Sequence, residues 1–127
     1  MTKRIVLVRF SGSITFAPDL AISLEQKGMK VESIDGRLLD TELPPCDVII
    51  QTGLDEPPDE GFVLLKRVRA LAPDTPILVC SGHDQATMSI TVHDLAKAKF
   101  IHRDKTVHDF GVFVQAIERI LEEKNAP

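Results

Sequence analysis

Hydrophobic residues along this chain follow two patterns, and the alternation between the patterns predicts its elements. Short, continuous apolar runs rich in β-branched residues indicate strands that are buried on both faces of a parallel sheet. We expect five such strands, around Ile5–Val8, Val31–Ile34, Val48–Ile50, Ile77–Cys80 and Phe100–Ile101. Each run is followed by a stretch of different periodicity.

In those stretches, apolar residues recur at helical spacing. Pro18 and Gly28 bracket a first helix, and Pro73 ends a helix whose apolar stripe runs from Phe62 to Leu71. Further helices are expected at Leu38–Leu39, over Met88–Leu95 and, after a Thr106 N-cap with Asp109 in a capping box, over Phe110–Leu121. Within Met88–Leu95, Ile90 points away from the stripe that the other apolar residues form.

Strands that alternate with helices predict an α/β fold. We expect a three-layer α/β/α sandwich around a five-stranded parallel sheet of order 2-1-3-4-5, which is the flavodoxin-like arrangement. A length of 127 residues indicates one domain, over residues 1–127. In this strand order, ligands bind where the first and third strands end. Candidate chemistry is therefore sought at the strand ends, in Arg9–Ser13, Gln51–Asp55, Ser81–His83 and the residues after Ile101.

Composition narrows the classes of function. The chain carries 15 Lys+Arg against 19 Asp+Glu, and scattered basic residues disfavour nucleic acid as a partner. No apolar run approaches the roughly 20 residues that cross a bilayer, so we expect no membrane span and a cytoplasmic location. Cys46 and Cys80 lie in segments that look like strands and lack metal or disulfide spacing, which predicts buried thiols.

Three stretches resemble the receiver domain of bacterial two-component response regulators. Gly61–Leu71 and Pro73–Asp84 are similar to the third helix, fourth strand and following turn of that family. Phe100–Asp104, followed by Thr106–Phe110, is similar to its fifth strand and the start of its last helix. The resemblance covers nearly the whole chain and implies the receiver type of the flavodoxin-like fold, with a phosphorylation pocket at the strand ends.

The resemblance also implies residues that this chain lacks. A receiver accepts a phosphoryl group on an aspartate after the third strand, beside Mg²⁺ held by an acidic pair after the first. Here Arg9 and Phe10 occupy the acidic positions. The phosphoacceptor position falls on Thr52 counting from Asp47, or on Gly53 counting back from Gly61.

The outer members of the receiver pocket are retained in part. Ser81 matches the switch hydroxyl and Phe100 the aromatic switch residue, while Arg103 stands where the family has lysine. We interpret the chain as a degenerate pseudo-receiver with no catalytic residue, no metal and no cofactor. Asp55 lies in a loop past the strand end, so we do not expect it to accept the phosphoryl group instead.

Two arginines are expected to occupy the altered pocket. We predict Arg9 and Arg103 on neighbouring strand ends, with Ser81 between them, and two guanidiniums need a negative group nearby. Carboxylates of the chain are the first candidates, namely Asp55, Glu56, Asp59 and Asp104. A bound anion or an acidic group of a partner is the other hypothesis.

Alternatives from other classes have weaker sequence support. The Ser11–Thr15 loop has a composition that can cradle phosphate, as in FMN-binding flavodoxins, but the chain has no Trp or Tyr to stack a flavin. A hydrolase built on Ser81 and His83 lacks the GxSxG elbow. The histidines His83, His93, His102 and His108 show no metal-ligand spacing.

Interaction with another protein is the remaining function. The resemblance implies a partner surface formed by the helix after Ser81, the Phe100–Ile101 strand and the last helix. Ile90 and Phe100 would contribute to this face, although ordinary core packing is an equally supported interpretation of Phe100. The sequence thus predicts a phosphorylation-independent signalling module that binds a protein partner or a second copy of itself.

Overall fold

The fold follows from a computed structural model that describes residues 3–9, 17–36, 42–52, 59–82, 84–102 and 110–125. The elements, in chain order, are β1 (Arg4–Arg9), α1 (Ala17–Gln26), β2 (Lys30–Asp35), β3 (Val48–Thr52), α2 (Asp59–Leu71), β4 (Ile77–Ser81), α3 (Gln85–Ala96), β5 (Lys99–His102) and α5 (Phe110–Asn125). Every strand predicted from the sequence is confirmed. The predicted helix at Leu38–Leu39 lies outside the described residues.

The strands form one parallel sheet in the order β2-β1-β3-β4-β5, which confirms the prediction. All five residues of β3 and of β4 are buried, as are Ile5–Val8 of β1. Burial on both faces explains why these runs are continuously apolar instead of alternating. The register brings the carboxyl ends of the strands to one edge of the sheet.

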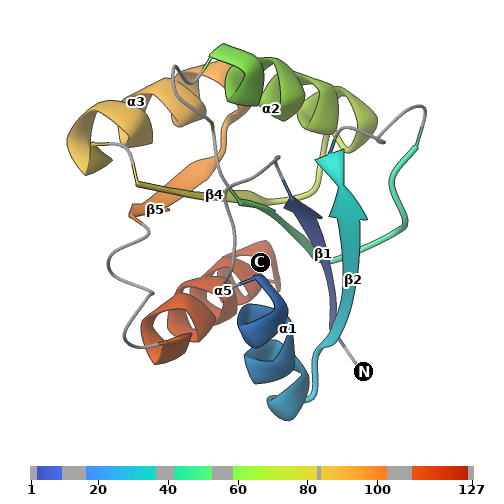
Figure 1. The fold of residues 1–127 in the computed structure, drawn as a ribbon. Helices are drawn as coiled ribbons and strands as arrows, with labels where there is room; N and C mark the ends of the chain where they lie inside the picture. The colour runs from blue at the N-terminus through green and yellow to red at the C-terminus, as the bar shows by residue number, and fades with distance from the viewer. Residues whose placement is uncertain are drawn as a thin grey trace.

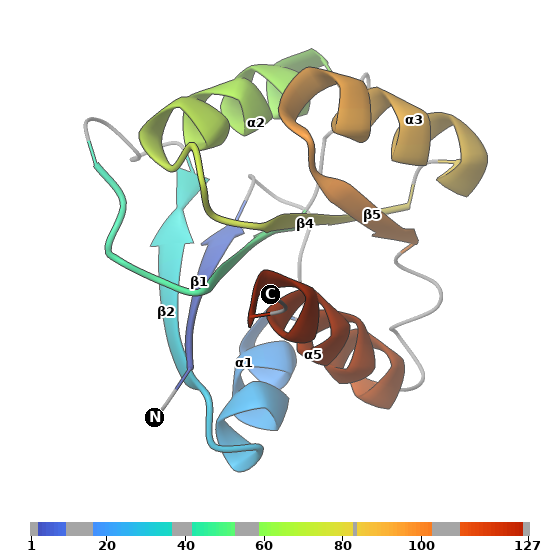
Figure 2. The ribbon, with the colours of Figure 1, turned by 180° about the vertical axis from the view of Figure 1, so that it is seen from behind.

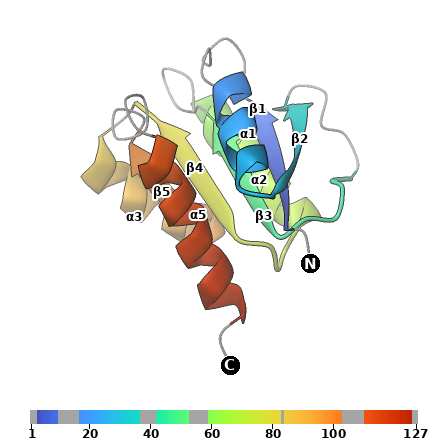
Figure 3. The ribbon, with the colours of Figure 1, turned by 90° about the horizontal axis from the view of Figure 1, so that it is seen from below.

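Helices cover both faces of the sheet, with α1 and α5 on one face and α2 and α3 on the other (Figures 1 and 2). Figure 3, seen from below, has α1 and α5 on the near side of the sheet. Because side chains alternate along a strand, Leu7 joins the core under α5 and Val8 joins the core under α2. The predicted three-layer sandwich is therefore confirmed.

Helices α1 and α2 end where Gly28 and Pro73 predicted their ends. Gly28 adopts φ 87° after α1, where Met29 N–H donates to the Leu24 carbonyl at 3.2 Å. This left-handed position suits glycine because it carries no Cβ. Helix α2 ends at Leu71, two residues before Pro73, as predicted.

The two cysteines differ in their surroundings. Cys80 is buried in β4, as predicted, but Cys46 is only partly buried and lies two residues before β3 begins. The expectation that Cys46 belongs to a strand is therefore wrong, since the preceding Pro44 and Pro45 cannot donate ladder hydrogen bonds. Both cysteines are among the described residues, and no disulfide joins them.

Within the described ranges, no helix is both long enough and apolar enough to cross a membrane. The longest, α5, carries charged residues along its outer side.

Candidate functional site

Three of the predicted pocket residues lie at the carboxyl edge of the sheet. Arg9 is the last residue of β1, Thr52 the last of β3 and Ser81 the last of β4. Arg9 and Thr52 are register partners on adjacent strands, where the strand order reverses. Arg9 is exposed, whereas Thr52 and Ser81 are buried.

Thr52 is held by the backbone of the neighbouring strand. Its side chain is fully buried, and its Oγ1 hydroxyl donates to the Val8 carbonyl at 3.4 Å. The preceding residue, Gln51, is also fully buried and donates its side-chain amide to the Gly61 carbonyl in α2 at 3.1 Å. The end of β3 is therefore tied through neutral side chains to β1 and to α2.

An acidic residue that sequence reasoning missed stands beside Arg9. The predicted second strand stopped at Ile34, but Asp35 is the last residue of β2 and the register partner of Arg9. Next to it, Gly36 is buried so closely that a Cβ would lie 2.6 Å from Leu64 Cδ2 and 3.1 Å from the Arg9 carbonyl oxygen. The missing side chain lets the end of β2 approach β1. The predicted strand order already placed these two strand ends side by side.

One predicted arrangement is wrong. The strands that Arg9 ends and Arg103 follows were expected to be neighbours, but β3 and β4 lie between β1 and β5. Arg103 itself lies outside the described residues. The alternation of side chains also separates the members of the predicted pocket. Arg9 follows Leu7 on the face covered by α1 and α5, while Ser81 follows Val79 on the face covered by α2 and α3.

The segment after Ser81 leads directly into α3. Asp84 is the N-cap of that helix, and its carboxylate accepts a hydrogen bond from the Thr87 backbone N–H at 3.0 Å. This hydrogen bond lowers the pKa of Asp84 because it stabilises the ionised carboxylate. The described start of α3 is thus capped from within the helix itself.

Solved structures of response regulators share this arrangement over nearly the whole chain. A CheY-like receiver domain protein from Methanospirillum hungatei JF-1 has a TM-score of 0.76 and 20% identity, covering 98% of this chain and 97% of that one. The Francisella response regulator 1452 receiver domain has a TM-score of 0.75 and 16% identity, covering 98% and 100%. This chain has the receiver fold.

Vibrio cholerae chemotaxis protein CheY4 is also similar, with a TM-score of 0.74 and 21% identity over 94% of this chain and 99% of that one. No protein-family model matches the sequence, and no curated protein matches it significantly. The resemblance seen in the sequence is therefore supported by the fold. The identities are too low to carry any function across.

The magnesium ion that receiver chemistry requires does not fit the strand ends of this receiver fold. Mg²⁺ prefers carboxylate and water oxygens, but β1 ends in a guanidinium at Arg9 and β3 ends in a neutral hydroxyl at Thr52. In sequence, Phe10 and Gly53 follow them and supply no carboxylate. Among the described residues, no group of three His, Cys, Asp or Glu side chains could hold a metal ion. The described ends of β1 and β3 therefore supply no carboxylate for a magnesium ion.

Part of the predicted site lies outside the described residues, and the predictions made for it stay predictions. This applies to the Ser11–Thr15 loop and therefore to the flavin-phosphate alternative. Asp59 begins α2, but its side chain is not described. The other residues outside the described ranges are Phe10, Gly53, Asp55, Glu56, His83, Arg103, Asp104, Thr106, His108 and Asp109.

The two residues of the predicted interaction face differ strongly in exposure. Ile90 is 66% exposed on α3, so its predicted position off the core stripe is confirmed. Phe100 is only 9% exposed and packs in the core with Val92 and Ala96. Core packing therefore accounts for Phe100, and of the two it is Ile90 that presents apolar surface on this side of the molecule.

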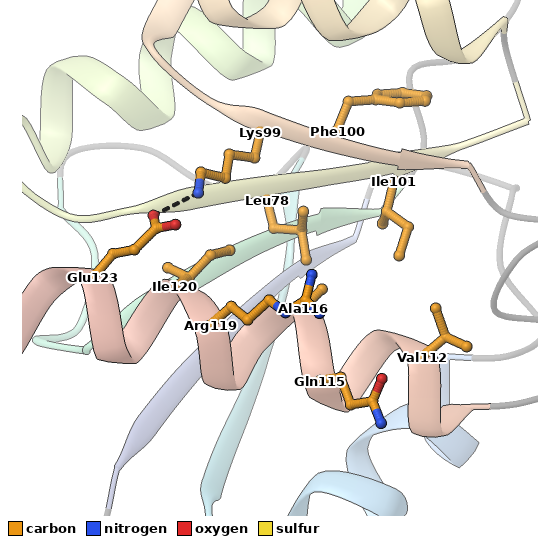
Figure 4. A pocket seen from close by; sticks show the side chains of 10 residues that line it. All are labelled: Leu78, Lys99, Phe100, Ile101, Val112, Gln115, Ala116, Arg119, Ile120 and Glu123. Atoms are coloured by element: carbon orange, nitrogen blue, oxygen red, sulfur yellow. Dashed lines mark hydrogen bonds and ion pairs between the residues drawn. The ribbon is translucent and has the colours of Figure 1, made fainter.

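A groove beside β5 adds residues that sequence reasoning did not select. It has a volume of about 400 Å³ and lies between β5 and α5, where Ile101 and Ile120 form apolar walls (Figure 4). Lys99 pairs with Glu123 across it at 2.5 Å, and Arg119 lies on the same side of α5. The periodicity of α5 could have indicated Arg119 and Glu123, because both fall off its core stripe.

Proposed function

We propose that this chain, acting as one receiver-like domain over residues 1–127, is a pseudo-receiver that binds protein partners without being phosphorylated. The observation that carries the proposal is the pairing of Arg9 with Thr52 at the ends of β1 and β3. Phosphoryl transfer to a receiver needs carboxylates on both strands, one set for the metal and one for the nucleophile. A chain without them has no enzymatic step to perform.

Electrostatics support the loss of this chemistry. A guanidinium at the end of β1 repels Mg²⁺ and favours a negative group instead, and Asp35 stands at the paired position of β2. A threonine hydroxyl is not ionised at neutral pH and cannot replace the aspartate nucleophile. The opposite charges of Arg9 and Asp35, at the ends of β1 and β2, would favour a single conformation of this edge of the sheet.

The partner surface that we propose consists of α3, β5 and α5. The exposed side chain of Ile90 and the apolar walls of the β5–α5 groove support it. Its occupant would be a signalling protein or a second copy of this chain. We propose the cytoplasm as its location, since cysteines without a disulfide are typical there.

A phosphodonor experiment tests the proposal directly. Incubation with acetyl phosphate and Mg²⁺ is expected to leave the intact mass of the protein unchanged, while a phosphorylatable receiver treated in parallel gains a phosphoryl group. The Asp55→Asn variant serves as the matched control for a displaced acceptor. A stoichiometric, acid-labile adduct would contradict the proposal, and its loss in Asp55→Asn would identify the acceptor.

Replacing Ile90 by aspartate tests the partner surface. Because Ile90 is 66% exposed, Ile90→Asp is expected to change the free energy of unfolding by no more than about 0.5 kcal/mol. It is expected to weaken self-association or partner binding about tenfold or more, as loss of a central apolar contact does. Sedimentation over a concentration series and binding titrations measure both effects.

The control for this variant is the same substitution on the opposite face. Ile22 on α1 is 53% exposed, and Ile22→Asp is expected to leave association unchanged. Equal association of the wild type, Ile90→Asp and Ile22→Asp would remove α3 from the proposed surface.

A further inference from the structure

The side chain of Arg69 joins three separate segments of the chain. It extends from the last turn of α2, and its Nε donates to the Ala96 carbonyl at 2.7 Å. Its Nη1 lies 2.9 Å from the Ala72 carbonyl oxygen, 3.2 Å from that of Pro73 and 2.7 Å from that of Thr75. One guanidinium thus contacts the end of α2, the turn before β4 and the last residue of α3.

Two of these acceptors, the Ala72 and Ala96 carbonyls, lie at the carboxyl-terminal ends of α2 and α3, whereas those of Pro73 and Thr75 lie in the turn before β4. The last carbonyls of a helix carry partial negative charge, so a cation placed there is stabilising. Only arginine offers a planar group of five N–H donors that can reach carbonyls in different directions at once. Partial burial lowers the pKa of Arg69 and Asp74 acts in the opposite direction, and the guanidinium stays charged at neutral pH.

The end of α3 that Arg69 reaches is also defined by its own backbone. Lys97 adopts a left-handed φ of 51°, and its N–H donates to the His93 carbonyl at 2.7 Å. Ala98 N–H then donates to the Val92 carbonyl at 3.2 Å before β5 begins. At the other end of α3, the Asp84 carboxylate accepts a hydrogen bond from the Thr87 N–H of the same helix.

We propose that Arg69 is a positioning residue that anchors the carboxyl-terminal end of α3 to α2 and thereby sets where α3 lies on the sheet. The hydrogen bond from Arg69 to Ala96 joins residues of α2 and α3 that are 27 positions apart in the chain. Any displacement of α3 is then restricted at this end, and Ile90 is carried by a helix that is held in place. The inference goes beyond the proposed function, because it holds whether or not the chain accepts a phosphoryl group.

Amide hydrogen exchange of the full chain tests the anchor. Arg69→Met keeps the apolar stem and removes every donor, and it is expected to speed exchange of the Lys97 and Ala98 amides about tenfold or more. Exchange in α1 and α5 is expected to change only by the shift in global stability, which urea unfolding measures separately. The control, Lys66→Met, removes an exposed cation from the same helix and is expected to leave the exchange of α3 unchanged.

Two outcomes would overturn the inference. One is unchanged exchange at Lys97 and Ala98 in Arg69→Met, and the other is an equal rise in α1, α3 and α5, which would make Arg69 a general contributor to stability. If Arg69→Met does not fold, Arg69→Lys replaces it, because lysine keeps the charge but not the planar donor group. The same local rise in exchange is then expected, and its absence would equally reject the anchor.

Discussion

Replacing Phe113 by alanine is expected to lower the free energy of unfolding by about 3–5 kcal/mol. Phe113 is fully buried and is among the largest side chains in the core between the sheet and α5. Its removal leaves a cavity against Ile50 and Ile117, members of the same cluster, because rigid strands relax only partly around it. Urea unfolding followed by far-UV circular dichroism measures the change.

The neighbouring residue supplies a matched control. Val112 lies on the same helix but is 39% exposed, so Val112→Ala is expected to change the free energy of unfolding by about 0.5 kcal/mol at most. Similar losses in Phe113→Ala and Val112→Ala would mean that α5 does not pack on the sheet through its predicted stripe.

Replacing Gly36 by alanine is expected to cost about 1–3 kcal/mol, by overpacking the point where β2 ends beside β1. The added Cβ would lie 2.6 Å from Leu64 Cδ2 and 3.1 Å from the Arg9 carbonyl oxygen. The tip of the leucine can rotate, but the backbone of β1 cannot move without breaking the sheet ladder. The strain therefore falls on the strand end that carries Arg9.

A double-mutant cycle with Leu64→Ala isolates this contact. Shortening Leu64 removes the closest atom, so the cost of Gly36→Ala is expected to shrink by about 0.5 kcal/mol or more in the Leu64→Ala background. Additive costs in the double variant would show that the two positions do not touch. The same unfolding assay serves all four proteins of the cycle.

Much of the fold could be predicted because it depends on local patterns. The continuous Ile5–Val8 run and the α5 stripe report burial directly, since strands and helices expose side chains with fixed periods. Gly28 and Pro73 marked helix ends for similarly local reasons. The proposal that receiver chemistry is lost also depends on residue types, because neither Arg9 nor Thr52 can take the place of a carboxylate.

The predictions failed at strand ends, where the neighbours of a residue depend on the sheet and not on the local sequence pattern. The predicted second strand stopped at Ile34, yet in the sheet Asp35 extends β2 and stands at the position paired with Arg9. Arg9 and Arg103 were expected on neighbouring strand ends, although the predicted strand order itself separates β1 from β5. The exposure of Phe100 could not be decided, because an aromatic residue on a short strand fits both a core and an interface.

By itself, the sequence determined which segments become strands and helices, the order of the strands and the absence of carboxylates from the expected receiver positions. Only the tertiary structure decided that Arg69 reaches α3, that Lys99 and Glu123 pair across a groove and that Phe100 is buried. The physical reason is the range of the interactions. Periodicity and residue type act over a few neighbouring positions, whereas these contacts join segments that become neighbours only when helices pack on the sheet.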